Sequence, residues 1–186
     1  MGRIADDRAA LIHQLQRAYS GELAAALAYR GHWRATPEGE DRARIRAIEE
    51  DEWHHRGLVG VMLGTLGAKP RFWLEVRAWL IGRTLGLLCH IAGWFLPMYG
   101  AGRLESRNVG EYERAATLAA RCDRADVIDG LLAMAEVEWD HEAYFRSRVE
   151  GHYALRWLPL WPPLPSRNGR QRAPLHRPRS GASAPP

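Results

Sequence analysis

The chain has 186 residues, of which 46% are hydrophobic, and a formal net charge of +4 at pH 7. This length and apolar content suffice for one domain with a substantial core, and they exclude a wholly disordered chain. The two cysteines, Cys89 and Cys122, are too few for a disulfide framework and lack CxxC spacing, so we expect a reducing, cytoplasmic setting. The charged residues 1–10 do not form the apolar segment of a secretory signal.

The charge is unevenly distributed along the chain. Residues 151–186 carry six arginines and no acidic residue, so their charge is +6. Since the whole chain has a net charge of +4, residues 1–150 have a net charge of about −2. Nucleic-acid binding would depend on the tail alone, and no nucleic-acid partner is expected. Eight of the eleven prolines also follow residue 150. We therefore expect residues 1–157 to form one domain and residues 158–186 to be a disordered Pro/Arg-rich tail. The apolar residues at this boundary can still pack back on the domain; they are Trp157, Leu158, Leu160 and Trp161.

Helices are predicted for most of residues 1–150, which are rich in Ala, Leu, Arg and Glu and show no strand pattern. The predicted helices are residues 6–35, 40–66, 71–87, 90–121 and 124–151. The turn residues 36–39 end the first helix, and Gly67 with Pro70 ends the second. We expect a kink near Pro97 and an N-cap at Asp123. The predicted fold class is all-α.

Acidic residues and histidines occupy positions of the four long helices where a purely apolar core face is expected. The pattern Glu-Trp-x-His occurs twice, at residues 52–55 and 138–141, and places Glu and His one turn apart on the same helix face. Glu22 and Glu105 lie in the middle of the apolar faces of the first and third long helices. Because an unpaired buried carboxylate is costly, we expect bound cations to compensate the charge.

The spacing of these residues places them at one level. Two residues of an antiparallel hairpin lie level when the turn is midway between them. The midpoint between Glu22 and Glu52 is Pro37, and the midpoint between Glu105 and Glu138 falls in the turn after the third long helix. Two copies of Glu…Glu-x-x-His then form the ligand set of di-iron and di-manganese carboxylate four-helix bundles, with Fe or Mn favoured over structural Zn. The predicted metal ligands are Glu22, Glu52, His55, Glu105, Glu138 and His141.

Several nearby residues have weaker predictions. Tyr29 and Tyr112 each follow a predicted glutamate ligand by seven residues, so we expect them to hydrogen-bond to ligands or oxygen, with a plain core role as the alternative. Asp51 either orients His55, which follows it by four residues, or faces solvent. The histidines expected to be structural or exposed rather than ligands are His32, His54, His90 and His152.

Residues 84–102 form a run of nineteen residues without formal charge. The run nears the length of a membrane span, but Pro97 and four glycines interrupt it. Three alternatives remain open for the aromatic-rich region 72–99. It contacts a membrane surface or a lipophilic ligand, it is buried in the core or a homodimer face, or it spans a membrane.

Four segments carry a family pattern, GELAAALAYRGH around Glu22, EDEWHH around Glu52, LESRNVGEY around Glu105 and EVEWDH around Glu138. Together they resemble the ferritin-like demethoxyubiquinone hydroxylases over about residues 10–150. The resemblance implies a ferritin-like four-helix bundle with an extra apolar connecting helix, in which the six predicted ligands bind two Fe ions. It also implies hydroxylation of a quinone precursor with O2 and an electron donor, by a protein peripheral on the inner face of the membrane. Before Tyr112, where the family has His, this chain has Glu111.

We therefore expect a di-iron monooxygenase or oxidoreductase that activates O2 to hydroxylate or oxidise a lipophilic substrate. One alternative is a ferroxidase or peroxidase that uses the same site without an organic substrate. The other is a non-catalytic metal-binding bundle. The sequence shows no nucleophilic triad and no phosphate-binding loop.

Overall fold

The computed structural model describes residues 2–165, and its regular elements in that range are all helical. Short 3-10 helices lie at Ala125–Val127 and Tyr153–Arg156. The five α-helices are α1 (Gly2–Ala35), α2 (Glu40–Thr65), α3 (Phe72–Leu88), α4 (Phe95–Arg121) and α5 (Ile128–Val149). The predicted all-α class is confirmed.

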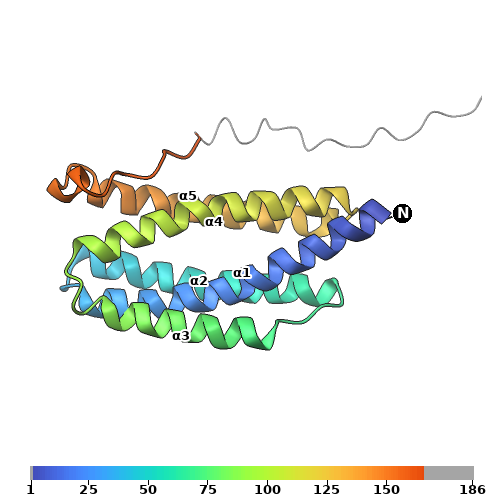
Figure 1. Cartoon of the computed structure of the whole chain (residues 1–186), viewed down its shortest axis with the longest axis horizontal. Helices are drawn as coiled ribbons and strands as arrows, with labels where there is room; N and C mark the ends of the chain where they lie inside the picture. The colour runs from blue at the N-terminus through green and yellow to red at the C-terminus, as the bar shows by residue number, and fades with distance from the viewer. Residues whose placement is uncertain (1, 166–186) are drawn as a thin grey trace, which may run out of the picture.

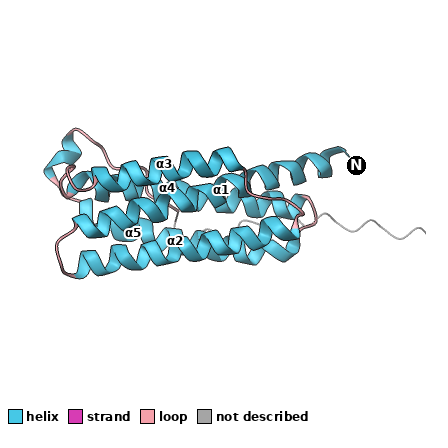
Figure 2. Ribbon diagram, turned by 90° about the horizontal axis from the view of Figure 1, so that it is seen from below, coloured by secondary structure: helices cyan, strands magenta, loops and turns pink. Residues whose placement is uncertain are grey.

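The helices lie along a common long axis, as two perpendicular views show (Figures 1 and 2). In Figure 1, α4 and α5 form one layer, and α1, α2 and α3 form the other. The closest packing is within the hairpins α1–α2 and α4–α5 and between α1 and α3, while α1 also packs on α4. This arrangement brings the middles of the four long helices together in the interior.

Two predicted details at the ends of α4 and α5 are wrong. Pro97 does not kink a helix, because α4 begins at Phe95 and Pro97 lies in its first turn, where a backbone N–H has no helical acceptor. Asp123 does not cap α5. It takes a left-handed conformation (φ 56°) in the turn after α4, and the short 3-10 helix precedes α5.

Helix α3 packs so closely against α1 that the two backbones are in contact. A Cβ atom added at Gly31 of α1 would overlap the backbone of Gly86 in α3, so the glycines permit this close approach. Glu75 of α3 accepts a 2.5 Å hydrogen bond from Ser20 of α1 and pairs with Arg56 of α2. The predicted connecting helix is therefore attached to both helices of the first hairpin.

The apolar core consists of two clusters separated by ionisable residues. One cluster contains Leu15, Leu63 and Leu131, and the other contains Ile48 and Phe145. On each of the four long helices, the residues predicted as ligands lie between the positions that enter one cluster and the positions that enter the other. The predicted common level of these residues therefore agrees with the packing.

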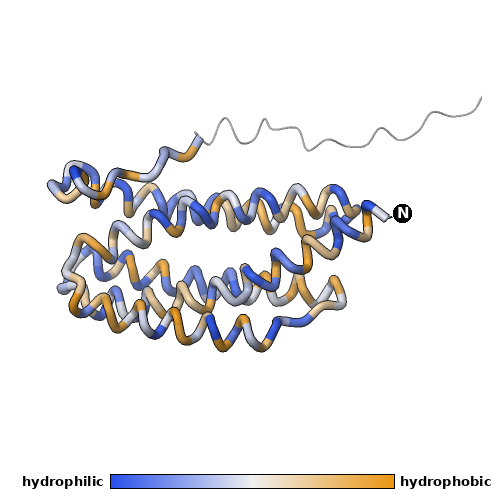
Figure 3. Tube along the Cα trace, viewed as in Figure 1, coloured by the Kyte–Doolittle hydropathy of each residue, from blue (hydrophilic) through white to orange (hydrophobic). Residues whose placement is uncertain are grey.

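The outer side of α3 and the turn that follows it expose large hydrophobic side chains. Figure 3 shows hydrophobic residues along much of α3, although this helix lies on the outside of the molecule. The exposed side chains include Phe72, Trp73, Trp79, Leu80, Leu87 and Ile91. Within residues 2–165, the structure has no helix with the length and hydropathy needed to cross a membrane, so the spanning alternative is not supported. Burial in the core of this chain is wrong for these residues, and contact with a membrane surface or a partner chain stays open.

The segment after α5 returns along α4 and α5 (Figure 1). Trp161 is 6% exposed, and its Nε1 donates a 2.6 Å hydrogen bond to Glu142. A Cβ atom at Gly102 would overlap the Trp161 ring, so the absence of a side chain at this glycine leaves room for the ring. The predicted packing of this segment on the domain is confirmed for Trp161, whereas Trp157 is 79% exposed. The disorder predicted for the tail beyond residue 165 lies outside the described residues.

Candidate metal centre

All six predicted ligands lie in the interior and come from four helices. None of them is more than 4% exposed. Helix α1 supplies Glu22, α2 supplies Glu52 and His55, α4 supplies Glu105, and α5 supplies Glu138 and His141. The helical period explains this placement, because each Glu-x-x-His pair occupies adjacent turns of one face.

The six side chains form two overlapping groups of four. Donor atoms of Glu22, Glu52, His55 and Glu138 lie within 4.8 Å of one another, and the same holds for Glu52, Glu105, Glu138 and His141. Glu52 and Glu138 belong to both groups. The geometry therefore provides two adjacent positions for a cation, with two shared carboxylates between them.

Several polar atoms of the cluster have no hydrogen-bond partner within the described part of the chain. They are Oε2 of Glu22, both carboxylate oxygens of Glu52, Oε2 of Glu138 and Nδ1 of His141. A buried polar group without a partner costs about 1–3 kcal/mol, and a charged group costs more. Four ionised carboxylates carry a charge that two divalent cations balance. The residues therefore fit a pair of cations by their donor atoms and by their charge.

Burial strongly affects the carboxyl groups of the cluster. It raises the pKa of Glu22, Glu52 and Glu105, and the nearby charge of Glu138 raises the pKa of Glu52 and Glu105 further. Burial also acts to raise the pKa of Glu138. The imidazole of His141, 3.7 Å away, and the hydrogen bond with His55 outweigh this effect and hold that pKa well below its usual range. Without a cation, Glu138 is thus the carboxylate best stabilised in its ionised form.

The two tyrosines cross between helices. Tyr29 of α1 donates a hydrogen bond to Glu105 of α4, and Tyr112 of α4 donates one to Glu22 of α1. Burial, followed by the charge of the accepting glutamate, raises the pKa of both phenols well above the usual value, so both are neutral donors. Each tyrosine therefore holds the glutamate of the opposite helix, and not the one seven residues before it.

The two imidazoles are also held across the hairpins. His55 Nδ1 lies 3.0 Å from Glu138 Oε1, and His141 Nε2 lies 3.0 Å from Asp51 Oδ2. Of the two alternatives for Asp51, orientation of His55 is wrong, because His55 is bonded to Glu138 of α5; Asp51 is partly exposed and bonded to His141 instead. Burial lowers the pKa of each histidine, but the acidic partners outweigh this effect and raise both pKa values.

Sequence reasoning missed one further contact of the cluster. Asn108 Nδ2 donates a 3.0 Å hydrogen bond to Glu105 Oε2. The signal was present, since Asn108 follows Glu105 by three residues on the same helix face. Of the histidines not predicted as ligands, His54 and His90 are exposed, His152 stacks on Phe95, and His32 is buried.

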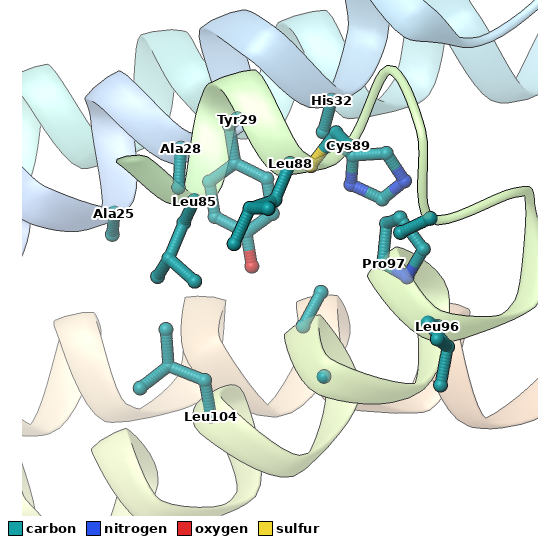
Figure 4. A pocket seen from close by; sticks show the side chains of 13 residues that line it. Ala25, Ala28, Tyr29, His32, Leu85, Leu88, Cys89, Leu96, Pro97 and Leu104 are labelled. Atoms are coloured by element: carbon teal, nitrogen blue, oxygen red, sulfur yellow. The ribbon is translucent and has the colours of Figure 1, made fainter. Parts of the chain in front are cut away.

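A cavity of about 420 Å³ lies beside the cluster, between α1, the end of α3 and the start of α4 (Figure 4). Its walls are almost wholly apolar, and Leu85, Leu88 and Leu104 contribute to them. Tyr29 also lines this cavity, while its hydroxyl group is bonded to Glu105. A single side chain thus connects the cavity with the carboxylate cluster.

Together, the fold and the site define an all-helical protein with a buried carboxylate–imidazole cluster. In comparisons with known proteins, no family model, no curated protein and no solved structure matches this chain. The function is therefore inferred from the geometry and chemistry of the residues themselves.

Proposed function

We propose that this chain is a ferritin-like, four-helix-bundle di-iron carboxylate oxidoreductase that uses O2 to hydroxylate or oxidise a lipophilic organic substrate. The observation that carries the proposal is the set of unpartnered, buried carboxylate oxygens shared between two four-residue groups. Two Fe ions, or Mn as the alternative, would be held by Glu22, Glu52, His55, Glu105, Glu138 and His141. When bound, such a metal pair supplies the reduction of O2 with electrons from an external donor.

The protein residues contribute orientation and exclusion of water. Tyr29 and Tyr112 hold the two unshared glutamates from the opposite helix, and Asp51 orients His141. Such partners fix the direction of a ligand's lone pairs and keep its geometry ready for a metal. The two apolar clusters on either side of the site limit its contact with bulk water.

The lipophilic substrate is supported by the apolar cavity beside Tyr29, whose volume lies in the usual range for small-molecule sites. A quinone precursor agrees with the family resemblance of the ligand segments. The exposed apolar side chains in the region 72–99 support peripheral contact with a membrane surface, and a homodimer face is the alternative. Flotation with liposomes separates the two alternatives. If the region contacts a membrane, the parent floats with the liposomes and a Trp73→Ser/Ile91→Ser variant does not; if it is a homodimer face, neither protein floats.

One observation favours a ferroxidase or peroxidase as the second candidate. A small cleft of about 60 Å³ reaches Glu22 and Tyr112 between α1 and α4, and Arg17, Asn108 and Glu111 contribute polar atoms to its walls. This cleft offers a polar route for a small ion or oxidant to the cluster. In that case the apolar cavity would have no catalytic role.

The test is O2 consumption by the full chain reconstituted with ferrous iron and supplied with a reductant. The proposal predicts turnover that depends on a quinol-like lipophilic additive and is lost in Glu52→Gln. Glu50→Gln, an exposed neighbour on the same helix, serves as the matched control and should retain turnover. Consumption that follows added Fe(II) alone, whatever the additive, would favour the ferroxidase, and an absence of turnover with iron bound would favour the non-catalytic bundle.

A further inference from the structure

The cavity beside Tyr29 has an uncharged wall with very few polar atoms. Only three of its thirteen lining residues, Tyr29, His32 and Cys89, have a polar side-chain atom, and none is a lysine, arginine, aspartate or glutamate. The Tyr29 hydroxyl is already bonded to Glu105. Figure 4 shows the His32 side chain pointing from α1 into the cavity, on the side of Cys89 and Pro97.

His32 is buried without using its imidazole for hydrogen bonding. The residue is 5% exposed, no side-chain hydrogen bond of its ring is found among residues 2–165, and its ring nitrogens are not among the fully enclosed atoms that lack a partner. Its hydrogen bonds run through the backbone oxygen, which accepts from Thr36. Burial lowers the pKa of His32 to about 4, so at neutral pH the ring has one unused donor and one unused acceptor. Because His32 lines the cavity, its ring is available to bond a ligand that enters there.

Neighbouring rings hold the His32 imidazole in place. It stacks on Phe145 and Tyr29, with ring centroids 6.1 and 6.3 Å apart. Since Tyr29 donates to Glu105, a molecule bonded to His32 would lie beside the tyrosine that touches the carboxylate cluster. The position of His32 therefore connects recognition in the cavity with the proposed metal centre.

We propose that His32 determines the specificity of this cavity by hydrogen-bonding an uncharged oxygen, a hydroxyl, carbonyl or ether, on a small and otherwise apolar ligand. The inference deepens the proposed function, on which it rests, by naming the chemical class of its substrate. A carboxylate or phosphate would find no cation in the wall, and an amine would find no anion. Leu85, Leu88 and Leu96 are each about half exposed at the cavity, so a hydrocarbon tail can extend outward along them.

The test uses three matched probes, 4-hexylphenol, hexylbenzene and the carboxylate 4-hexylbenzoate. They share the hexyl tail and the ring, and they differ in the polar group on the ring. Binding to the full chain is measured by calorimetry, and the imidazole nitrogens of His32 are followed by NMR. Hexylphenol is expected to bind about tenfold more tightly than hexylbenzene, the ratio that one net hydrogen bond provides, and hexylbenzoate is expected to bind weakest. The His32 nitrogen signals should shift with hexylphenol and change little with hexylbenzene.

Two variants and a control make the result specific. His32→Phe should keep the affinity for hexylbenzene and lose the preference for hexylphenol, whereas His32→Gln, which can still donate and accept, should retain part of it. His54→Phe, at an exposed histidine of α2, should change neither affinity. An unchanged preference in His32→Phe, tightest binding of hexylbenzoate, or no binding of any probe would each overturn the inference.

The same titrations are run with and without iron, because this separates the inference from the proposed function. Loss of iron binding with an intact phenol preference would reject the metal centre and keep the His32 site. Intact iron binding without a phenol preference would reject the His32 site and keep the metal centre.

Discussion

The hairpins α1–α2 and α4–α5 have the same ligand pattern but different electrostatics. Glu52 and Glu138 hold equivalent places in the repeated Glu-Trp-x-His. Neither oxygen of Glu52 has a hydrogen-bond partner in the described structure, and its nearest imidazole nitrogen is His141 Nδ1 at 3.7 Å, whereas Glu138 is hydrogen-bonded to His55 at 3.0 Å. Burial consequently raises the pKa of Glu52, while the histidines hold that of Glu138 low. The repeat thus specifies where a carboxylate lies, and the contacts between hairpins determine its charge state.

The hairpins also differ in what covers them. Helix α3 packs on the first hairpin through the glycine contact with α1, and the short segment around Trp161 packs on the second. The apolar cavity lies at the α3 side, beside Tyr29, and the small polar cleft lies beside Tyr112. The apolar cavity and the polar cleft thus approach the cluster beside different tyrosines.

The largest expected effect concerns the cover of the second hairpin. Trp161→Ala removes a buried ring and its hydrogen bond to Glu142, and we expect the free energy of unfolding to fall by about 4 kcal/mol. Gly102→Ala should also destabilise the protein, because the added methyl group displaces the Trp161 ring. Urea unfolding followed by circular dichroism measures both. Trp157→Ala, at an exposed ring, is the control and should lie within about 0.5 kcal/mol of the parent.

Glutamine substitutions in the two repeats should act in opposite directions on the metal-free chain. Glu138→Gln removes the charge that both histidines stabilise, and we expect a loss of about 3 kcal/mol in unfolding free energy. Glu52→Gln removes a carboxyl group whose burial is unfavourable, and we expect a gain of about 1 kcal/mol. Urea unfolding at pH 7 after chelation measures both changes. Shifts of the same sign and size would contradict the asymmetry.

The pH dependence of stability should reveal the buried His32. Its pKa is about 4 in the folded chain against 6.5 for the free side chain, so between these values the unfolded chain binds the proton first. The free energy of unfolding should therefore fall as the pH drops from 6.5 toward 4, by about 1.5 kcal/mol between pH 6.5 and 5. The difference between the parent and His32→Gln isolates this contribution, and a difference that does not vary with pH would reject it.

The smallest expected effect tests the symmetry of the crossed tyrosines. Tyr29→Phe and Tyr112→Phe each remove one hydrogen bond to a buried carboxyl group, and each should lower the unfolding free energy of the metal-free chain by about 1 kcal/mol. The double variant should depart from the sum, because the accepting residues Glu22 and Glu105 belong to one electrostatically coupled cluster. A much larger loss for one tyrosine would show that the two halves are held differently.

The sequence predicts the level of the ligands well, because helical periodicity and the midpoint of a hairpin turn determine that level. Glu22, Glu52, Glu105 and Glu138 follow from these two regularities. The partner of Asp51 does not follow from them, because residue spacing along α2 carries no information about which side chain of α5 lies beside it. The seat of Trp161 and the cavity at His32 likewise depend on how helices pack laterally, and a periodic pattern in one helix does not encode its neighbours' positions.

The iron content of the full chain tests the proposed metal centre most directly. The protein is reconstituted with ferrous salt under anaerobic conditions, desalted and analysed for metal, next to a Glu52→Ala/Glu138→Ala variant that lacks both shared carboxylates. We expect two ions per chain in the parent and loss of tight binding in the variant. Fewer than one ion per chain in the parent, or unchanged uptake by the variant, would contradict this expectation.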